Sequence, residues 1–101
     1  MPGFFSNLFK MRDDADYAAL VKNGAVIVDV RTTTEYNLYG HIKGSVNIPL
    51  DELAGKISRL DKSKPVITVC QSGARSKSAS SYLSKLGYEV YNGGSWNTFS
   101  V

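Results

Sequence analysis

The most regular feature of the chain is a set of short apolar runs separated by stretches with helical spacing. Two runs, at residues 25–28 and 65–69, are rich in valine and isoleucine. An apolar run without alternation is typical of a strand that is covered on both faces, as in a parallel sheet. Shorter runs at residues 46–48 and 88–91 predict two further strands.

Helical patterns occupy stretches between these runs and ahead of the first one. Asp13 or Asp14 can cap a first helix that runs to about Lys22. A longer helical pattern starts at Arg75 and stops at Gly87, where a left-handed terminator belongs. The sequence therefore predicts one helix before the first strand and one after the strand at 65–69.

Two more helices are predicted from their capping residues. Residues 32–35 fit a capping box, so we expect a short helix there. Asp51 can cap another helix that turns Leu53, Ile57 and Leu60 inward. Strands that alternate with helices at these lengths predict an α/β fold, with a largely parallel sheet and helices on both faces.

Length and composition limit what such a fold can be. The chain has 101 residues, of which 43% are hydrophobic, and this suits one compact domain with a single core. We expect residues 1–12 to form an N-terminal extension and residues 13–101 to form the single domain. The phenylalanines of the extension can contact a membrane or a partner, but we favour their packing onto the domain.

Charge and cysteine content narrow the classes of partner. The net charge of +3 comes from scattered lysines and arginines, so we expect no nucleic-acid partner, although small anions are attracted. One cysteine and one histidine cannot form a disulfide or a zinc site, and we expect no metal and no other cofactor. A free reactive thiol favours a reducing compartment, which predicts a cytoplasmic protein. No apolar segment approaches the ~20 residues of a transmembrane helix.

The only cysteine, Cys70, stands where chemistry is expected in such a fold. It follows the run at 65–69, and the small or polar residues 71–74 separate it from the helix at Arg75. Open α/β sheets bind ligands at the carboxyl ends of their strands. Loop N–H groups and a helix N-terminus at this position lower a thiol pKa by stabilising the thiolate. We therefore interpret Cys70 as a nucleophile rather than as a buried structural cysteine.

Several motifs occur along the chain in a fixed order. They are Asp29-Val30-Arg31, Glu35-Tyr36, the stretch from Gly40 to Pro49, Cys70-x-x-Gly73-x-Arg75-Ser76, and Asn92-Gly93-Gly94 followed by Trp96. In this order and spacing they resemble the rhodanese-like sulfurtransferase domains, from about Asp14 to Phe99. The resemblance implies a five-stranded, mainly parallel sheet with helices on both faces.

The resemblance also implies the activity of a thiosulfate sulfurtransferase. Such an enzyme takes a sulfane sulfur from a small anionic donor, thiosulfate or a persulfide, and holds it as a persulfide on Cys70. Cyanide or a thiol, including a thiol on a protein, then accepts the sulfur. The implied persulfide-binding loop comprises Gln71, Ser72, Gly73, Ala74, Arg75 and Ser76. Arg75 either holds the incoming anion or braces the loop, and both roles remain open.

Four other residues are interpreted as structural support: Asp29, Arg31, Glu35 and His41. Asp29 ends a buried strand and needs hydrogen-bond partners there. Arg31 and Glu35 can pair in a two-pronged contact. His41 is expected to fix a turn, because no group that would orient a Cys–His pair accompanies it. Trp96 can roof the pocket, but we favour a core position for it.

Other functions can use the same residues. A cysteine-dependent phosphatase or arsenate reductase also holds an anion over a thiolate, but phosphatase loops are longer than residues 71–74, which separate Cys70 from Arg75. A regulatory binding module, or a non-enzymatic sulfur relay to a protein, would use the fold without small-molecule turnover. Inactive members of the family commonly lack the cysteine, so Cys70 favours the enzyme.

Overall fold

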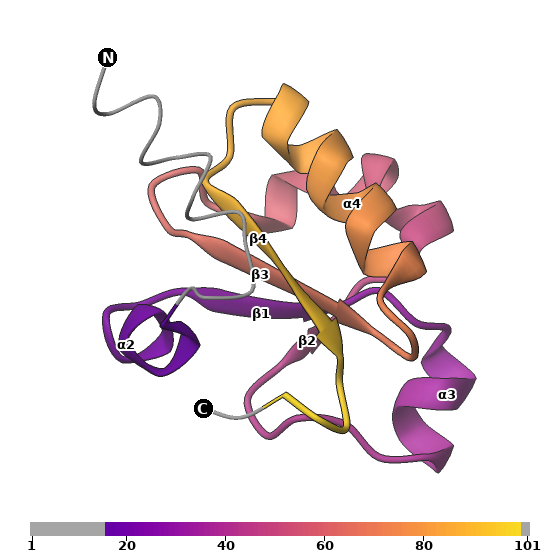
Figure 1. Cartoon of the computed structure of the whole chain (residues 1–101). Helices are drawn as coiled ribbons and strands as arrows, with labels where there is room; N and C mark the ends of the chain where they lie inside the picture. Colours follow the sequence, from indigo (N-terminus) through magenta and orange to yellow (C-terminus); the bar gives the residue numbers. More distant parts are fainter. Residues whose placement is uncertain (1–15, 100–101) are drawn as a thin grey trace.

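A parallel sheet forms the centre of the molecule in the computed structural model, which describes residues 16–99 (Figure 1). Its strands are β1 (Val26–Asp29), β2 (Val46–Asn47), β3 (Val66–Cys70) and β4 (Val90–Ser95). They lie in the order β2-β1-β3-β4, and each neighbouring pair is parallel. The predicted α/β fold is therefore confirmed.

The expected number of strands is wrong by one. Residues 16–99 form four strands, whereas the resemblance implied five. The apolar runs of the sequence account for all four of them. The fifth strand was implied by the resemblance alone, and no additional apolar run stands behind it in the described part of the chain.

Helices cover both faces of the sheet, as predicted. Side chains of β3 alternate between the two faces, so Val66 and Cys70 belong to one apolar cluster, and Ile67 and Val69 to the other. The helix α4 (Ala74–Lys85) packs on the first face and α2 (Tyr17–Lys22) on the second (Figure 1). Burial on both faces explains why the sequence of β3 is a continuous apolar run.

Two short helices begin at caps close to those expected from the sequence. The side chain of Asp16 caps α2 by accepting a hydrogen bond from the backbone of Ala19, while Asp13 and Asp14 lie outside the described residues, as does the extension at residues 1–12. The helix α3 (Thr33–Leu38) has the predicted capping box. The hydroxyl of Thr32 accepts from the N–H of Glu35 at 3.2 Å, and the Glu35 carboxylate accepts from the N–H of Thr32 at 3.0 Å.

No described helix is long and apolar enough to cross a membrane.

The helix predicted after Asp51 is replaced by two 3₁₀ segments, η1 (Leu50–Glu52) and η2 (Ala54–Arg59). The predicted inward side is right, because Leu53 and Leu60 are buried. The helix type is wrong, since Gly55 lies inside the segment and Lys56 departs from helical geometry with φ −117°. A glycine in so short a segment lowers the stability of an α-helix, and i to i+3 bonds form instead.

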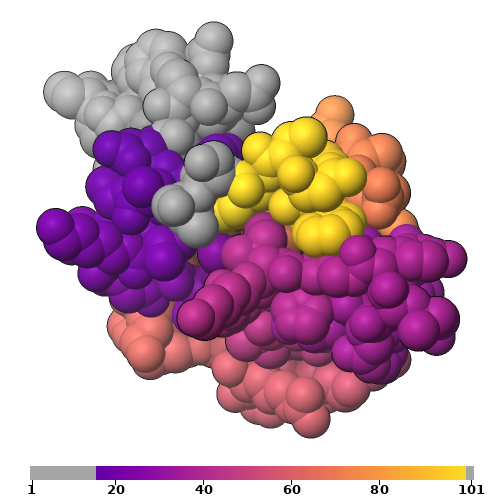
Figure 2. Space-filling view, turned by 90° about the horizontal axis from the view of Figure 1, so that it is seen from below, coloured from indigo at the N-terminus to yellow at the C-terminus, as the bar shows by residue number. Residues whose placement is uncertain are grey.

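A buried ion pair joins the end of β1 to the segment that follows it. Asp29 and Arg31 are both fully buried, and the Arg31 Nη2 and Nε donate to the Asp29 carboxylate at 2.6 and 2.9 Å. Arg31 Nη2 also donates to the carbonyl oxygen of Gly40 at 2.8 Å, and its guanidinium lies 4.4 Å from the ring centroid of Trp96. The space-filling view shows the C-terminal segment (yellow) against the segment that follows α3 (magenta; Figure 2). Arg31 thus ties the segment after α3 and the C-terminal segment to the end of β1.

Replacing Arg31 by methionine is expected to lower the free energy of unfolding by about 3–5 kcal/mol, because it leaves the buried Asp29 carboxylate without its partner. Urea denaturation followed by circular dichroism measures this loss. Lys56→Ala is the matched control, since it breaks an exposed pair with Glu52 and should cost about 1 kcal/mol or less. Equal losses in the two variants would contradict the role assigned to the buried pair.

Candidate active site at the carboxyl ends of the strands

A tight turn links the end of β3 to the start of α4. Cys70 is the last residue of β3 and Ala74 the first residue of α4, one position before the predicted start at Arg75. Gly73 caps the helix in the left-handed region, with φ 97°. A residue with a Cβ adopts this conformation only at a cost, so the glycine permits the turn. The turn places the N-terminus of α4 next to the sulfur of Cys70.

The sulfur of Cys70 receives hydrogen bonds from the turn. The backbone N–H groups of Gly73 and Ser76 donate to Sγ at 3.0 and 3.3 Å, and the Ser76 Oγ lies 3.4 Å from it. Burial raises the pKa of the Cys70 thiol, but contacts with the Ser76 hydroxyl and with the N–H groups of Ser76, Gly73 and Ser72 outweigh that effect. The pKa therefore lies below its ordinary value, which favours the thiolate.

Arg75 makes a two-pronged ion pair that crosses from α4 to α3. Its Nη1 and Nη2 donate to the two carboxylate oxygens of Glu35 at 2.7 and 2.9 Å. The predicted pairing of Glu35 with Arg31 is wrong, because Arg31 uses its guanidinium on Asp29 and Gly40. Of the two roles left open for Arg75, the observed contact is the bracing one. The Arg75 guanidinium, followed by hydrogen bonds from Thr32, lowers the pKa of Glu35 from 4.5 to about 2, against the opposing effect of burial.

His41 lies in the segment after α3. Its Nδ1 is 2.9 Å from the carbonyl oxygen of Tyr36, and the two rings stack with centroids 3.7 Å apart. Among the described residues, no recorded hydrogen bond joins His41 to Cys70, so the structure does not bring them together as a Cys–His pair.

Trp96 lies at the edge of the core, beside the loop. Its ring packs against the apolar cluster on the α2 face, while its Nε1 donates to the Oε1 of Gln71 at 3.1 Å. The indole therefore contacts both the core and the first residue of the loop.

Asn92 is the residue of this site that the sequence did not single out. Its side-chain oxygen lies 2.6 Å from the Ser76 Oγ, which is itself 3.4 Å from the sulfur of Cys70. In the sequence Asn92 is visible only as part of a turn-like Asn-Gly-Gly motif. No local pattern indicates that Asn92 contacts Ser76 of α4. The two side chains meet only because β4 pairs with β3.

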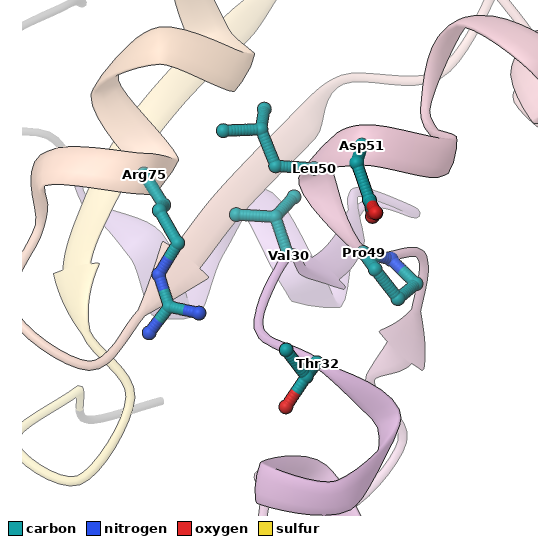
Figure 3. A pocket seen from close by; sticks show the side chains of 6 residues that line it. All are labelled: Val30, Thr32, Pro49, Leu50, Asp51 and Arg75. Atoms are coloured by element: carbon teal, nitrogen blue, oxygen red, sulfur yellow. The ribbon is translucent and has the colours of Figure 1, made fainter.

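A cavity of about 390 Å³ opens beside the loop (Figure 3). It is lined by Val30, Thr32, Pro49, Leu50, Asp51 and Arg75. The N–H of Val30, one of the lining residues, donates to the carbonyl oxygen of Val69 at 3.0 Å, and Val69 directly precedes Cys70. In the described part of the chain, no three His, Cys, Asp or Glu side chains gather as metal ligands. A small molecule in this cavity would meet an apolar wall, with Arg75 on one side and Asp51 on another (Figure 3).

Comparisons by sequence and by structure match this chain to the same group of known proteins. A family model described as "Rhodanese-like domain" matches residues 13–99. A protein named thiosulfate sulfurtransferase GlpE, from Ectopseudomonas mendocina, is 38% identical over 85 residues, which cover 83% of this chain and 77% of that protein.

Two solved structures are similar in fold and sequence. One, titled "rhodanese with anions from E. coli", has a TM-score of 0.70 and 32% identity, and the match covers 77% of this chain and 94% of that chain. The other is the reduced CoADR-RHD of Bacillus anthracis, with a TM-score of 0.73 and 36% identity. The match covers 81% of this chain but only 14% of that much longer chain.

Replacing Arg75 by glutamine is expected to return the pKa of Glu35 most of the way from about 2 toward 4.5, because the guanidinium is the main cause of its lowering. Carbon-detected NMR of the side-chain carboxyl measures the change. A carboxylate with a lowered pKa stabilises the fold above its unfolded-state pKa, and this stabilisation is lost as the pH falls toward the folded-state value.

Asp61 is the internal control for this titration. Its pKa is lowered by the N–H and hydroxyl of Ser63, so it should not respond to Arg75→Gln. A Glu35 pKa that stays at its parent value in the variant would contradict the assigned ion pair.

Proposed function

The chain belongs to the rhodanese-like domain family, and we propose on this basis that it is a sulfurtransferase that carries a sulfane sulfur on Cys70. The observation that carries the proposal is the pair of backbone N–H groups directed at Sγ from Gly73 and Ser76. They stabilise a negative charge on sulfur without a metal or a general base. The relative from Ectopseudomonas mendocina is named for this activity.

The proposed first step loads Cys70 with sulfur. The Cys70 thiolate attacks the outer sulfur of thiosulfate, a new S–S bond forms, and sulfite leaves with the electron pair of the broken S–S bond. A persulfide donor reacts in the same way and releases a thiolate. The outer sulfur of the Cys70 persulfide then carries the negative charge and lies among the N–H groups at the start of α4.

The second step unloads the sulfur onto a nucleophile. Cyanide attacks the outer sulfur and leaves as thiocyanate, or a thiolate attacks it and becomes a persulfide, and Cys70 returns to the thiolate. Every leaving group in both steps is a stable anion, so no strong general acid is needed. The hydrogen-bond partners of the Cys70 sulfur in the described residues are backbone N–H groups and the Ser76 hydroxyl, and none of these is a strong acid.

The pairing of Arg75 favours sulfur transfer over phosphate chemistry. Both of its Nη atoms donate to Glu35, so the ion pair already balances the charge of the guanidinium and leaves only its remaining N–H groups to a phosphate. The short spacing of residues 71–74 favours the same conclusion, because it suits a ring of amides around one sulfur atom. A non-catalytic binding module would not need a thiol with a lowered pKa.

Exposure to thiosulfate is expected to add one sulfur atom to the intact protein, located on Cys70 and removed by cyanide. Mass spectrometry of the protein and of its peptides measures this. Cys70→Ser should fold normally, stay unmodified and form no thiocyanate, because it lacks the nucleophile.

Hydrolysis of an aryl phosphate serves as the counter-assay. Efficient hydrolysis by the parent, together with no gain of sulfur from thiosulfate, would reject sulfur transfer in favour of the phosphatase. A folded Cys70→Ser variant with substantial thiocyanate formation would reject Cys70 as the carrier.

The cavity beside the loop is proposed as the route of an anionic donor to Cys70. Val30 lines it, and Arg75 and Asp51 carry the charges along its lining. Because Glu35 neutralises Arg75, the Asp51 carboxylate is the unbalanced charge that an approaching anion meets there. Asp51 therefore weakens the binding of thiosulfate by repulsion.

Asp51→Asn is expected to raise kcat/KM for thiosulfate about fivefold at low salt, since removing one nearby like charge is worth on the order of 1 kcal/mol. The gain should shrink at high ionic strength. Glu52→Gln, next in sequence but outside the cavity lining, is the matched control and should change kcat/KM little. Equal effects of the two substitutions would show that the donor does not pass through the cavity.

A further inference from the structure

The contact between Ser76 and Asn92 has a defined direction. The Oδ1 of Asn92 accepts a hydrogen bond from the N–H of Gly94 at 3.1 Å, and its Nδ2 lies 3.5 Å from the carbonyl oxygen of Gly73. These backbone partners determine which end of the amide is oxygen. Because that oxygen is only an acceptor, the Ser76 hydroxyl must be the donor in their 2.6 Å contact.

The direction of this bond determines what Ser76 offers to the sulfur. A hydroxyl has one proton, and here the proton is used on Asn92. The Ser76 Oγ therefore presents a lone pair to the Cys70 Sγ, 3.4 Å away, and accepts from the thiol S–H. The three residues form a chain in which Cys70 S–H donates to Ser76 and Ser76 O–H donates to Asn92.

Tertiary packing holds this chain of hydrogen bonds in place. Asn92 pairs in register with Thr68, so its side chain lies on the same face of the sheet as Thr68, toward α4. The Thr68 hydroxyl donates to the carbonyl oxygen of Ser76 at 2.8 Å, which ties the first turn of α4 to the strand below. Ser76 and Cys70 are both buried, and each has its hydrogen-bond partners within the protein.

We propose that Asn92 is a positioning residue that holds the Ser76 hydroxyl with its lone pair toward Cys70, so that formation of the thiolate requires this hydroxyl to turn. When the thiol proton leaves for solvent, a lone pair facing a negative sulfur becomes unfavourable. The Ser76 O–H then turns to donate to the sulfur and gives up its bond to Asn92. The role in sulfur transfer rests on the function proposed above, whereas the hydrogen-bond exchange concerns the thiol alone.

Asn92 therefore opposes ionisation of the thiol, and Ser76 supports it. The Ser76 proton has three acceptors within reach: Asn92 Oδ1 at 2.6 Å, the carbonyl oxygen of Gly73 at 3.1 Å, and the sulfur at 3.4 Å. Removing the strongest competitor leaves the proton to the Gly73 carbonyl oxygen and to the sulfur, and a negatively charged sulfur is the better acceptor of the two. This consequence has the opposite sign to that of a merely structural role, in which any loss at Asn92 loosens the loop and weakens the thiolate.

Charged groups around the loop do not change this reasoning. From α4 comes Arg75 and from α3 its partner Glu35, while β1 and the segment after it contribute the mutually paired Asp29 and Arg31. None of these described side chains has a recorded hydrogen bond to Asn92 or to the Ser76 hydroxyl. Substitutions at Asn92 and Ser76 thus leave these ion pairs in place.

The test is the rate of alkylation of Cys70 by iodoacetamide as a function of pH, in the parent and in three variants. Asn92→Leu, which keeps the size but removes the acceptor, is expected to lower the apparent pKa of Cys70 by about half a unit to one unit. Ser76→Ala is expected to raise it, because the thiolate loses a donor. In the double variant the pKa should equal that of Ser76→Ala alone, since no hydroxyl is left to turn.

Each alternative outcome has a distinct meaning. If Asn92→Leu still shifts the pKa of Cys70 in the Ser76→Ala background, Asn92 acts through the loop backbone, and the proposal is overturned. An unchanged or raised pKa of Cys70 in folded Asn92→Leu would also overturn it. Asn92→Ala covers the case in which leucine is not accommodated: it also removes the oxygen acceptor, so it should lower the pKa as well. The alkylation rate does not depend on sulfur transfer, so the parallel thiocyanate assay reports separately on the proposed function.

Discussion

The sulfur of Cys70 is held by hydrogen bonds that exist only because the chain turns sharply between β3 and α4. Gly73, with φ 97°, brings its own N–H to 3.0 Å from the sulfur, and the first turn of α4 adds the N–H of Ser76. Unpaired N–H groups at a helix N-terminus need an acceptor. Here the acceptor is the sulfur, so the geometry that satisfies the helix also stabilises a thiolate.

Two arginines near the site have their charge balanced by a carboxylate. Arg31 is bound to Asp29 inside the fold, and Arg75 is bound to Glu35 at its edge. Cations that are already paired brace the elements they join and add little net charge at the sulfur. In the proposed sulfur transfer, whose nucleophiles and leaving groups are anions, selectivity for one sulfur atom then rests on backbone dipoles of fixed position.

The side chains of Ser76 and Asn92 add a second level of control to this arrangement. The backbone donors favour the thiolate at all times, whereas the hydroxyl of Ser76 can support either protonation state according to where its proton points. A thiol kept partly in check by Asn92 is less exposed to unwanted oxidation or alkylation while it waits for a donor. Reactivity thus comes from the backbone donors at the sulfur, and protection comes from Asn92, which acts on the sulfur through the Ser76 hydroxyl.

Local sequence determined the strands, the capping box of α3, and the place of Cys70 at the end of a strand before a helix, because each depends on residues close together in the chain. Tertiary structure alone decided which residues from distant parts of the chain contact one another. Glu35 pairs with Arg75, 40 residues away, rather than with the nearby Arg31, and Ser76 meets Asn92 because β4 lies beside β3 in one register. The 3₁₀ form of residues 50–59 does not follow from the apolar spacing, since the inward residues of an α-helix and of a 3₁₀ segment are nearly the same over so few turns. Hydrogen bonds and ion pairs form between groups that are close in space. Residues that are far apart in the sequence come close only in the complete fold, so a local pattern does not show which of them will pair.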